Sequence, residues 1–92
     1  MSAGLNTATI DLGSTPVAEA QLFVADAAIA ATNYVEVFVQ VDSTGDNDVE
    51  AHRHAAASWK LVAEAVSGGF NLDITCLIDL CWGTFKLRYV YA

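Results

Sequence analysis

The sequence has few charged residues, and most of them are acidic. Charged side chains make up 16% of its 92 residues, although 54% of the residues are hydrophobic. An average soluble domain has a charged fraction of about 25%. Four Lys and Arg residues against eleven Asp and Glu residues give a net charge of −7. Because binding to a phosphate backbone needs clustered Lys and Arg, we expect no direct nucleic-acid binding.

Long hydrophobic runs and targeting signals are also missing. No apolar stretch approaches the roughly 20 residues that span a bilayer, so we expect no membrane association. The first residues contain neither a basic n-region nor an apolar h-region, which predicts that there is no signal peptide. We therefore expect synthesis in the cytosol, where the two cysteines stay reduced.

Sequence motifs for catalysis are missing as well. No serine lies in a Gly-x-Ser-x-Gly turn, and the spacing of Cys76 and Cys81 matches neither a redox CxxC motif nor a zinc knuckle. Cys76 has the parity of a core residue and is expected to act as a small hydrophobe, with a disulfide to Cys81 only in an oxidising setting. The sequence predicts that this protein is not an enzyme and needs no cofactor.

Alternating apolar and polar residues dominate what is present. In residues 34–42 the four odd positions are all valine. A period of two places one set of side chains on each face of a sheet. Similar alternation or β-favouring composition predicts six strands, at residues 7–12, 21–25, 34–42, 58–66, 70–76 and 84–91.

Short connections between successive strands favour antiparallel pairing. The predicted fold is all-β: a compact antiparallel β-sandwich of about six strands, forming a single domain over residues 1–92. A small barrel is the nearest alternative. The side chains predicted to face the core include Ile10, Leu12, Val35, Val37, Val39, Val41, Trp59, Leu61, Phe70, Leu72, Ile74, Cys76, Phe85, Leu87, Tyr89 and Tyr91.

One long acidic loop interrupts the strand pattern at residues 43–57. Its second half is rich in alanine and predicts a short helix with Asn47 or Asp48 as the N-cap. Carboxylates between Asp42 and Glu50 raise the alternative of a calcium loop, but the order does not fit an EF-hand. We favour a solvated acidic loop.

Two histidines in this loop raise the further alternative of a zinc site. On a helix, Glu50 and His54 would share a face while His52 would point away, and zinc needs three or four converging ligands. We therefore expect both histidines to be hydrogen-bonding or interface residues, and we assign no metal ligand.

The apolar surplus and the distribution of charge favour self-association. Three basic residues, Lys60, Lys86 and Arg88, have outward parity, so a basic sheet face could meet the acidic loop of a neighbouring copy, with ordinary solvated charge as the equal alternative. Trp82 and Tyr34 have the parity of interface aromatics, with a second core face as the alternative. The candidate interface residues are Asp46, Asp48, Glu50, His52, Arg53, His54, Lys60, Trp82, Lys86 and Arg88.

Three segments, IDLGSTPV (residues 10–17), LFVADAAI (22–29) and TNYV (32–35), resemble short accessory virion proteins of tailed bacteriophages. These are small β-sandwiches of the capsid decoration or fibre type. The resemblance implies a capsid decoration, or cement, subunit that assembles in the host cytoplasm, forms a trimer and contacts other virion proteins such as the major capsid protein. A tail-fibre or baseplate module is the alternative within this class, and no site residues follow from it.

A glycan-binding β-sandwich is the alternative from a different class. Such a module holds sugars on surface aromatic side chains, with calcium in the acidic loop as an additional feature. Trp59 is expected to face the core, which leaves Trp82 as the tryptophan available to a sugar.

Overall fold

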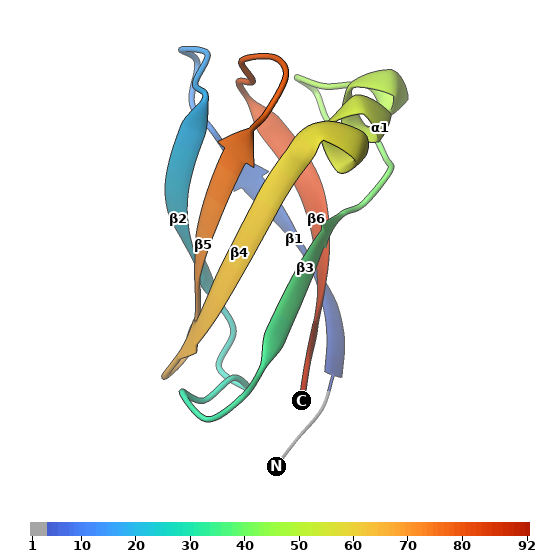
Figure 1. Cartoon of the computed structure of the whole chain (residues 1–92). Coiled ribbons are helices and arrows are strands. Elements are labelled where there is room, and N and C mark those ends of the chain that lie inside the picture. The colour runs from blue at the N-terminus through green and yellow to red at the C-terminus, as the bar shows by residue number, and fades with distance from the viewer. Residues whose placement is uncertain (1–3) are drawn as a thin grey trace.

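The computed structural model describes residues 4–92 and confirms the β-sandwich prediction. Two three-stranded antiparallel sheets, of order β1-β6-β3 and β2-β5-β4, pack face to face (Figure 1). The elements in chain order are β1 (Gly4–Asp11), β2 (Glu19–Ala25), β3 (Val35–Val39), α1 (Val49–Ser58), β4 (Trp59–Val66), β5 (Gly69–Cys76) and β6 (Thr84–Tyr91).

The core lies between the two central strands, β5 and β6. Their inward side chains are almost completely buried, as the alternation predicted, because each central strand has a neighbour on both sides and a sheet in front. Aromatic pairs tie the layers together: the rings of Phe70 and Tyr89 lie 4.9 Å apart, and those of Trp59 and Phe85 4.6 Å apart. The buried inward residues of these two strands are Phe70, Leu72, Ile74, Phe85, Leu87 and Tyr89.

The third predicted strand is shorter in the structure than in the sequence pattern. β3 ends at Val39, and Val41, which was expected to face the core, is 47% exposed. The Gln40 N–H still donates to the Lys86 carbonyl, but the chain then leaves the sheet toward α1. The prediction for Val41 was therefore wrong, because parity along the chain does not show where a strand leaves its sheet.

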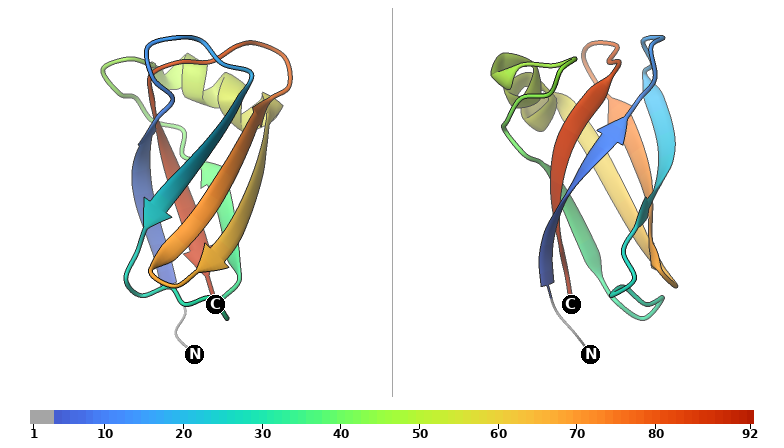
Figure 2. Two further views of the ribbon diagram at one scale, coloured as in Figure 1. Left: turned by 90° about the vertical axis from the view of Figure 1, so that its left-hand side faces the viewer. Right: turned by 180° about the vertical axis from the view of Figure 1, so that it is seen from behind.

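The predicted helix in the long loop is present as α1. Asp48 is its N-cap, and its carboxylate accepts a hydrogen bond of 2.8 Å from the Ala51 N–H. The helix ends directly before β4, and it lies at the end of the sandwich that also holds the β1–β2 and β5–β6 connections, whereas the C-terminus lies at the opposite end (Figure 2).

A tight turn at Ser67 and Gly68 joins β4 to β5. Gly68 has a φ of +87°, a conformation that glycine adopts without steric cost. The next residue, Gly69, pairs with both Val66 and Ala25, and a Cβ atom there would collide with the Val24 carbonyl oxygen. Glycine at this position lets β2 pair closely with the start of β5.

Asp26 links the two sheets at the end opposite α1. It directly follows β2, and its carboxylate accepts a 2.6 Å hydrogen bond from the Tyr89 hydroxyl on β6. The Ala28 N–H and the Asn6 side-chain amide also donate to it. The Tyr89 hydrogen bond is the main cause that lowers the pKa of Asp26 below its ordinary value of 3.8, with the Ala28 N–H as the next cause.

We expect the Tyr89→Phe substitution to raise the pKa of Asp26 and to reduce the loss of stability in acid. A lowered pKa means that ionised Asp26 stabilises the fold above pH 3.8, and that this contribution is lost as the pH falls through the folded-state pKa. NMR titration of the Asp26 carboxyl carbon, together with melting temperatures from pH 7 to pH 2, would measure both effects. Tyr34→Phe is the matched control, because Tyr34 is 79% exposed. An unchanged Asp26 titration in the Tyr89→Phe variant would contradict this assignment.

Candidate functional site

The acidic side chains of the long loop form hydrogen bonds and ion pairs with groups of their own chain. One carboxylate oxygen of Asp46 accepts hydrogen bonds from the backbone N–H and the hydroxyl of Thr84, both at 2.9 Å, and so fixes the loop to the start of β6. Asp48 caps α1, and Asp42 lies 3.4 Å from the ammonium of Lys86. The Ser43 N–H and, next, Lys86 lower the pKa of Asp42. These carboxylates have separate partners and do not point toward a common centre.

His52 is a core residue, so its assignment to an interface was wrong. Its side chain is completely buried, and its ring lies 5.0 Å from that of Phe85. Nε2 accepts a 3.0 Å hydrogen bond from the Lys86 backbone N–H, and Nδ1 lies 2.9 Å from the Asp48 carbonyl oxygen. Since these partners are a donor and an acceptor, the ring is neutral with its proton on Nδ1. Of the two expected roles, hydrogen bonding is the one that the structure shows.

The exposed side of α1 carries the other charged residues of the helix. Arg53 forms an ion pair with Glu50 one turn earlier. His54 Nε2 lies 3.0 Å from the carboxylate of Asp79, which belongs to the connection between β5 and β6. The helix and that connection therefore form one end surface of the sandwich.

The three outward basic residues do not share a sheet face. Lys60 lies on β4, whereas Lys86 and Arg88 lie on β6, and these strands belong to different sheets whose outer faces point in opposite directions. Lys86 contacts Asp42 of its own chain, and the Arg88 guanidinium lies 5.7 Å from the centre of the Phe38 ring. The expected single basic face was therefore wrong, because parity assigns a side chain to a face of its own sheet only.

An apolar loop at the helix end was not predicted, because the sequence pattern gave residues 77–83 only as the connection between two strands. Four large apolar side chains of this 77–82 loop are exposed: Leu77 by 64%, Ile78 by 70%, Leu80 by 61% and Trp82 by 44%. Trp82 is thus a surface residue, as an interface role requires. The signal was available, because turns are normally rich in Gly, Pro, Asn, Asp and Ser, and this one reads LIDLCW.

The 77–82 loop is held in place by hydrogen bonds at its second half. The backbone groups of Val17 and Cys81 exchange two hydrogen bonds, of 2.8 and 3.0 Å. The indole N–H of Trp59 also donates to the Cys81 sulfur, at 3.2 Å. These hydrogen bonds fix the backbone at Cys81, in the loop that carries the exposed apolar side chains.

The two cysteines are free thiols in this structure. Cys76 packs against the core, as its parity predicted. Burial, followed by the neighbouring Cys81, raises the pKa of Cys76 to about 12. The thiolate is the reactive form of cysteine, so this environment does not favour Cys76 as a nucleophile.

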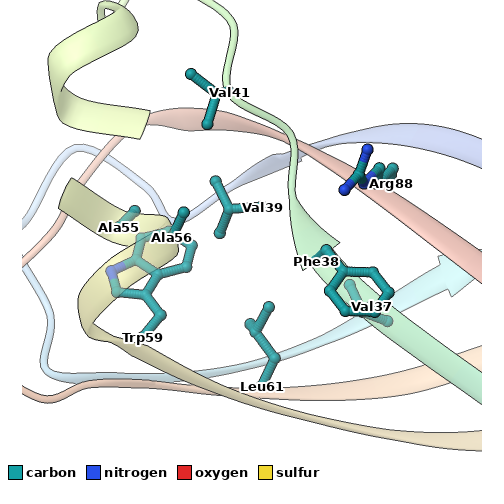
Figure 3. Close-up of a pocket in the computed structure, with 9 residues that line it drawn as sticks. All are labelled: Val37, Phe38, Val39, Val41, Ala55, Ala56, Trp59, Leu61 and Arg88. Carbon is teal, nitrogen blue, oxygen red and sulfur yellow. The ribbon is translucent and has the colours of Figure 1, made fainter. Parts of the chain in front are cut away.

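A groove of about 450 Å³ lies between β3, β4 and α1 (Figure 3). Its lining side chains are apolar except for that of Arg88 at one side, although backbone groups add polar surface, and no acidic or nucleophilic side chain lies among them. The groove is suited to apolar side chains of a partner. Its lining residues are Val37, Phe38, Val39, Val41, Ala55, Ala56, Trp59, Leu61 and Arg88.

Residues 4–92 contain neither a cluster of metal-ligating side chains nor a membrane-spanning helix. Nowhere in this range do three or more His, Cys, Asp or Glu side chains gather in a way that would hold a metal ion. The single described helix is too short and too polar to cross a bilayer.

No protein-family model and no curated protein sequence matches this chain.

We expect the His52→Leu substitution to lower the free energy of unfolding by about 2 kcal/mol. Leucine fills a similar volume but leaves the Lys86 N–H without its acceptor in a buried place. Urea denaturation would measure the change. His54→Leu is the control, because its side chain is 45% exposed and its pair with Asp79 lies at the surface, so we expect a change within about 0.5 kcal/mol. Equal losses in the two variants would contradict the buried role of His52.

Proposed function

We propose that this protein is a structural subunit that works by contact alone, as an accessory protein of a bacteriophage virion. The observation that carries this proposal is the 77–82 loop, which presents Leu77, Ile78 and Leu80 to solvent on a backbone fixed at Val17. Several exposed large apolar side chains on one loop of a small protein are a typical sign of an interaction site, because exposing them to water is unfavourable. Within residues 4–92, no cluster of metal-ligating side chains accompanies this surface.

The charge of the molecule favours a protein partner over a lipid surface. Cytoplasmic membrane surfaces are negative and attract basic segments, whereas this chain has a net charge of −7. Asp79 lies within the loop, and Asp46 lies nearby, bonded to Thr84 at the start of β6. The 77–82 loop is thus an apolar surface with an acidic border, which fits an apolar pocket with basic residues at its rim.

The proposed role of a capsid decoration, or cement, subunit is supported by this surface together with the resemblance in residues 10–35. A protein that binds an assembled shell more tightly than free subunits stabilises the shell by mass action and needs no reaction. The partner is then the major capsid protein, and the location is the virion, assembled in the host cytoplasm. A tail-fibre or baseplate module would use the same kind of contact with a different virion partner.

The glycan-binding alternative is supported less well by the positions of the aromatic residues. Trp82 lies in the β5–β6 connection beside α1, whereas Tyr34 is hydrogen-bonded to Ala92 at the opposite end of the sandwich. Two exposed rings at opposite ends do not form one platform for a sugar.

We expect the double substitution Leu77→Ser and Ile78→Ser to weaken binding to capsid shells by more than about tenfold, because it removes the two most exposed aliphatic side chains of the 77–82 loop. The probe is shells assembled from the major capsid protein encoded in the same genome as this chain, and the measurement is co-sedimentation over a concentration series.

Leu5→Ser is the matched control, because Leu5 is 67% exposed but lies on β1, away from the 77–82 loop. We expect this variant to bind like the unchanged protein, and melting temperatures would verify that all variants are folded. If the unchanged protein did not bind the shells, or if Leu5→Ser weakened binding equally, the proposed docking surface would be wrong.

A further inference from the structure

β4 is the edge strand that borders the groove, and half of its backbone groups are not used by the sheet. The Leu77 N–H donates to the Ser58 carbonyl, so these opposite residues form a hydrogen-bonded pair in register with β4 and β5. Antiparallel ladders alternate, and the even-numbered residues of β4 therefore bond to β5. The odd-numbered residues, at positions 59, 61, 63 and 65, direct their N–H and C=O groups toward the open edge.

The outward side chains of β4 can pair with those of a second, antiparallel copy of β4. Lys60 and Glu64 lie on either side of Val62, and all three are exposed. An antiparallel pairing of two copies about Val62 would set Lys60 of each copy directly opposite Glu64 of the other. Such opposite residues belong to the closely spaced, non-hydrogen-bonded pairs, in which unlike charges attract. Among residues 4–92 neither charge has an ion-pair partner.

The same register fits the inner side of the strand. Ala63 of one copy would lie opposite Leu61 of the other, and Ala65 opposite Trp59. Leu61 and Trp59 line the groove between β4, β3 and α1, which has a volume of about 450 Å³ (Figure 3). The second half of β4 of the partner copy has only Ala63 and Ala65 on its inner side. Its backbone can therefore approach the groove without a large side chain in the way.

We propose that the β4 edge is a self-association surface, and that its partner is β4 of a second copy in a two-fold antiparallel dimer. The two β2-β5-β4 sheets then become one six-stranded sheet, and each groove is covered by the other copy. A shift of two residues sets Lys60 or Glu64 against Val62, and a shift of four sets like charges together, so the charges select one register. This inference goes beyond the proposed function, which concerns the 77–82 loop, and it gives a dimer where the sequence analysis expected a trimer.

Charge reversal at the two positions tests the pairing. Light scattering after size exclusion, over a concentration series, should give twice the 9.8 kDa mass of the chain for the unchanged protein. Lys60→Glu and Glu64→Lys, made singly, each set like charges together twice across the interface, and we expect the dimer dissociation constant to rise by roughly tenfold or more. The double variant Lys60→Glu with Glu64→Lys restores unlike pairs, so we expect the dimer to return.

Glu19→Lys is the control for charge, because Glu19 is exposed on β2 at the other edge of the same sheet. It should leave the dissociation constant unchanged, and so should the Leu77→Ser and Ile78→Ser double variant. A monomer at all concentrations, a trimer, or single variants with unchanged mass would overturn the pairing. Shell binding by the unchanged protein, measured separately, shows whether the proposed function itself stands.

Discussion

The packing of β5 against β6 is the contact on which the rest of this molecule depends. These are the central strands of the two sheets, and Leu72 and Leu87 on their inner faces are completely inaccessible to solvent. Each of the other four strands is hydrogen-bonded to one of these two. A chain of 92 residues has little apolar volume to bury, and four of its five largest fully buried side chains, Phe70, Leu72, Ile74 and Leu87, lie on these two central strands.

This arrangement leaves four edge strands, which lie in pairs on the two sides of the sandwich. β1 and β2 run beside one side of the sandwich, and β3 and β4 beside the other, where α1 covers only part of the opening (Figures 1 and 2). His52 attaches the helix to β6 from within the core, through hydrogen bonds to Asp48 and Lys86. This buried ring thus holds the helix against β6, at the end of the sandwich where the groove and the 77–82 loop lie.

The six strands were predictable because alternation is a local property that each strand displays by itself. The N-cap at Asp48 was predictable for the same reason, since a cap needs only the next three residues of the chain. The predictions failed where a residue's environment is provided by a distant segment. Val41 has core parity but lies beyond the end of the sheet. His52 lies in a polar stretch of the sequence, but its ring is buried, packs against Phe85 and accepts a hydrogen bond from the Lys86 N–H.

The amino-acid sequence by itself determined the fold class, the approximate strand positions and the charge of the molecule, because periodicity and composition are contained in the chain. Only the tertiary structure decided which charges share a face: Lys60 is separated from Lys86 and Arg88 because β4 and β6 are in different sheets. The tertiary structure also decided that the apolar side chains of the 77–82 loop are exposed, because exposure depends on which other segments pack against a residue. Sheet membership and burial are long-range properties, and pairing between strands far apart in the chain creates both.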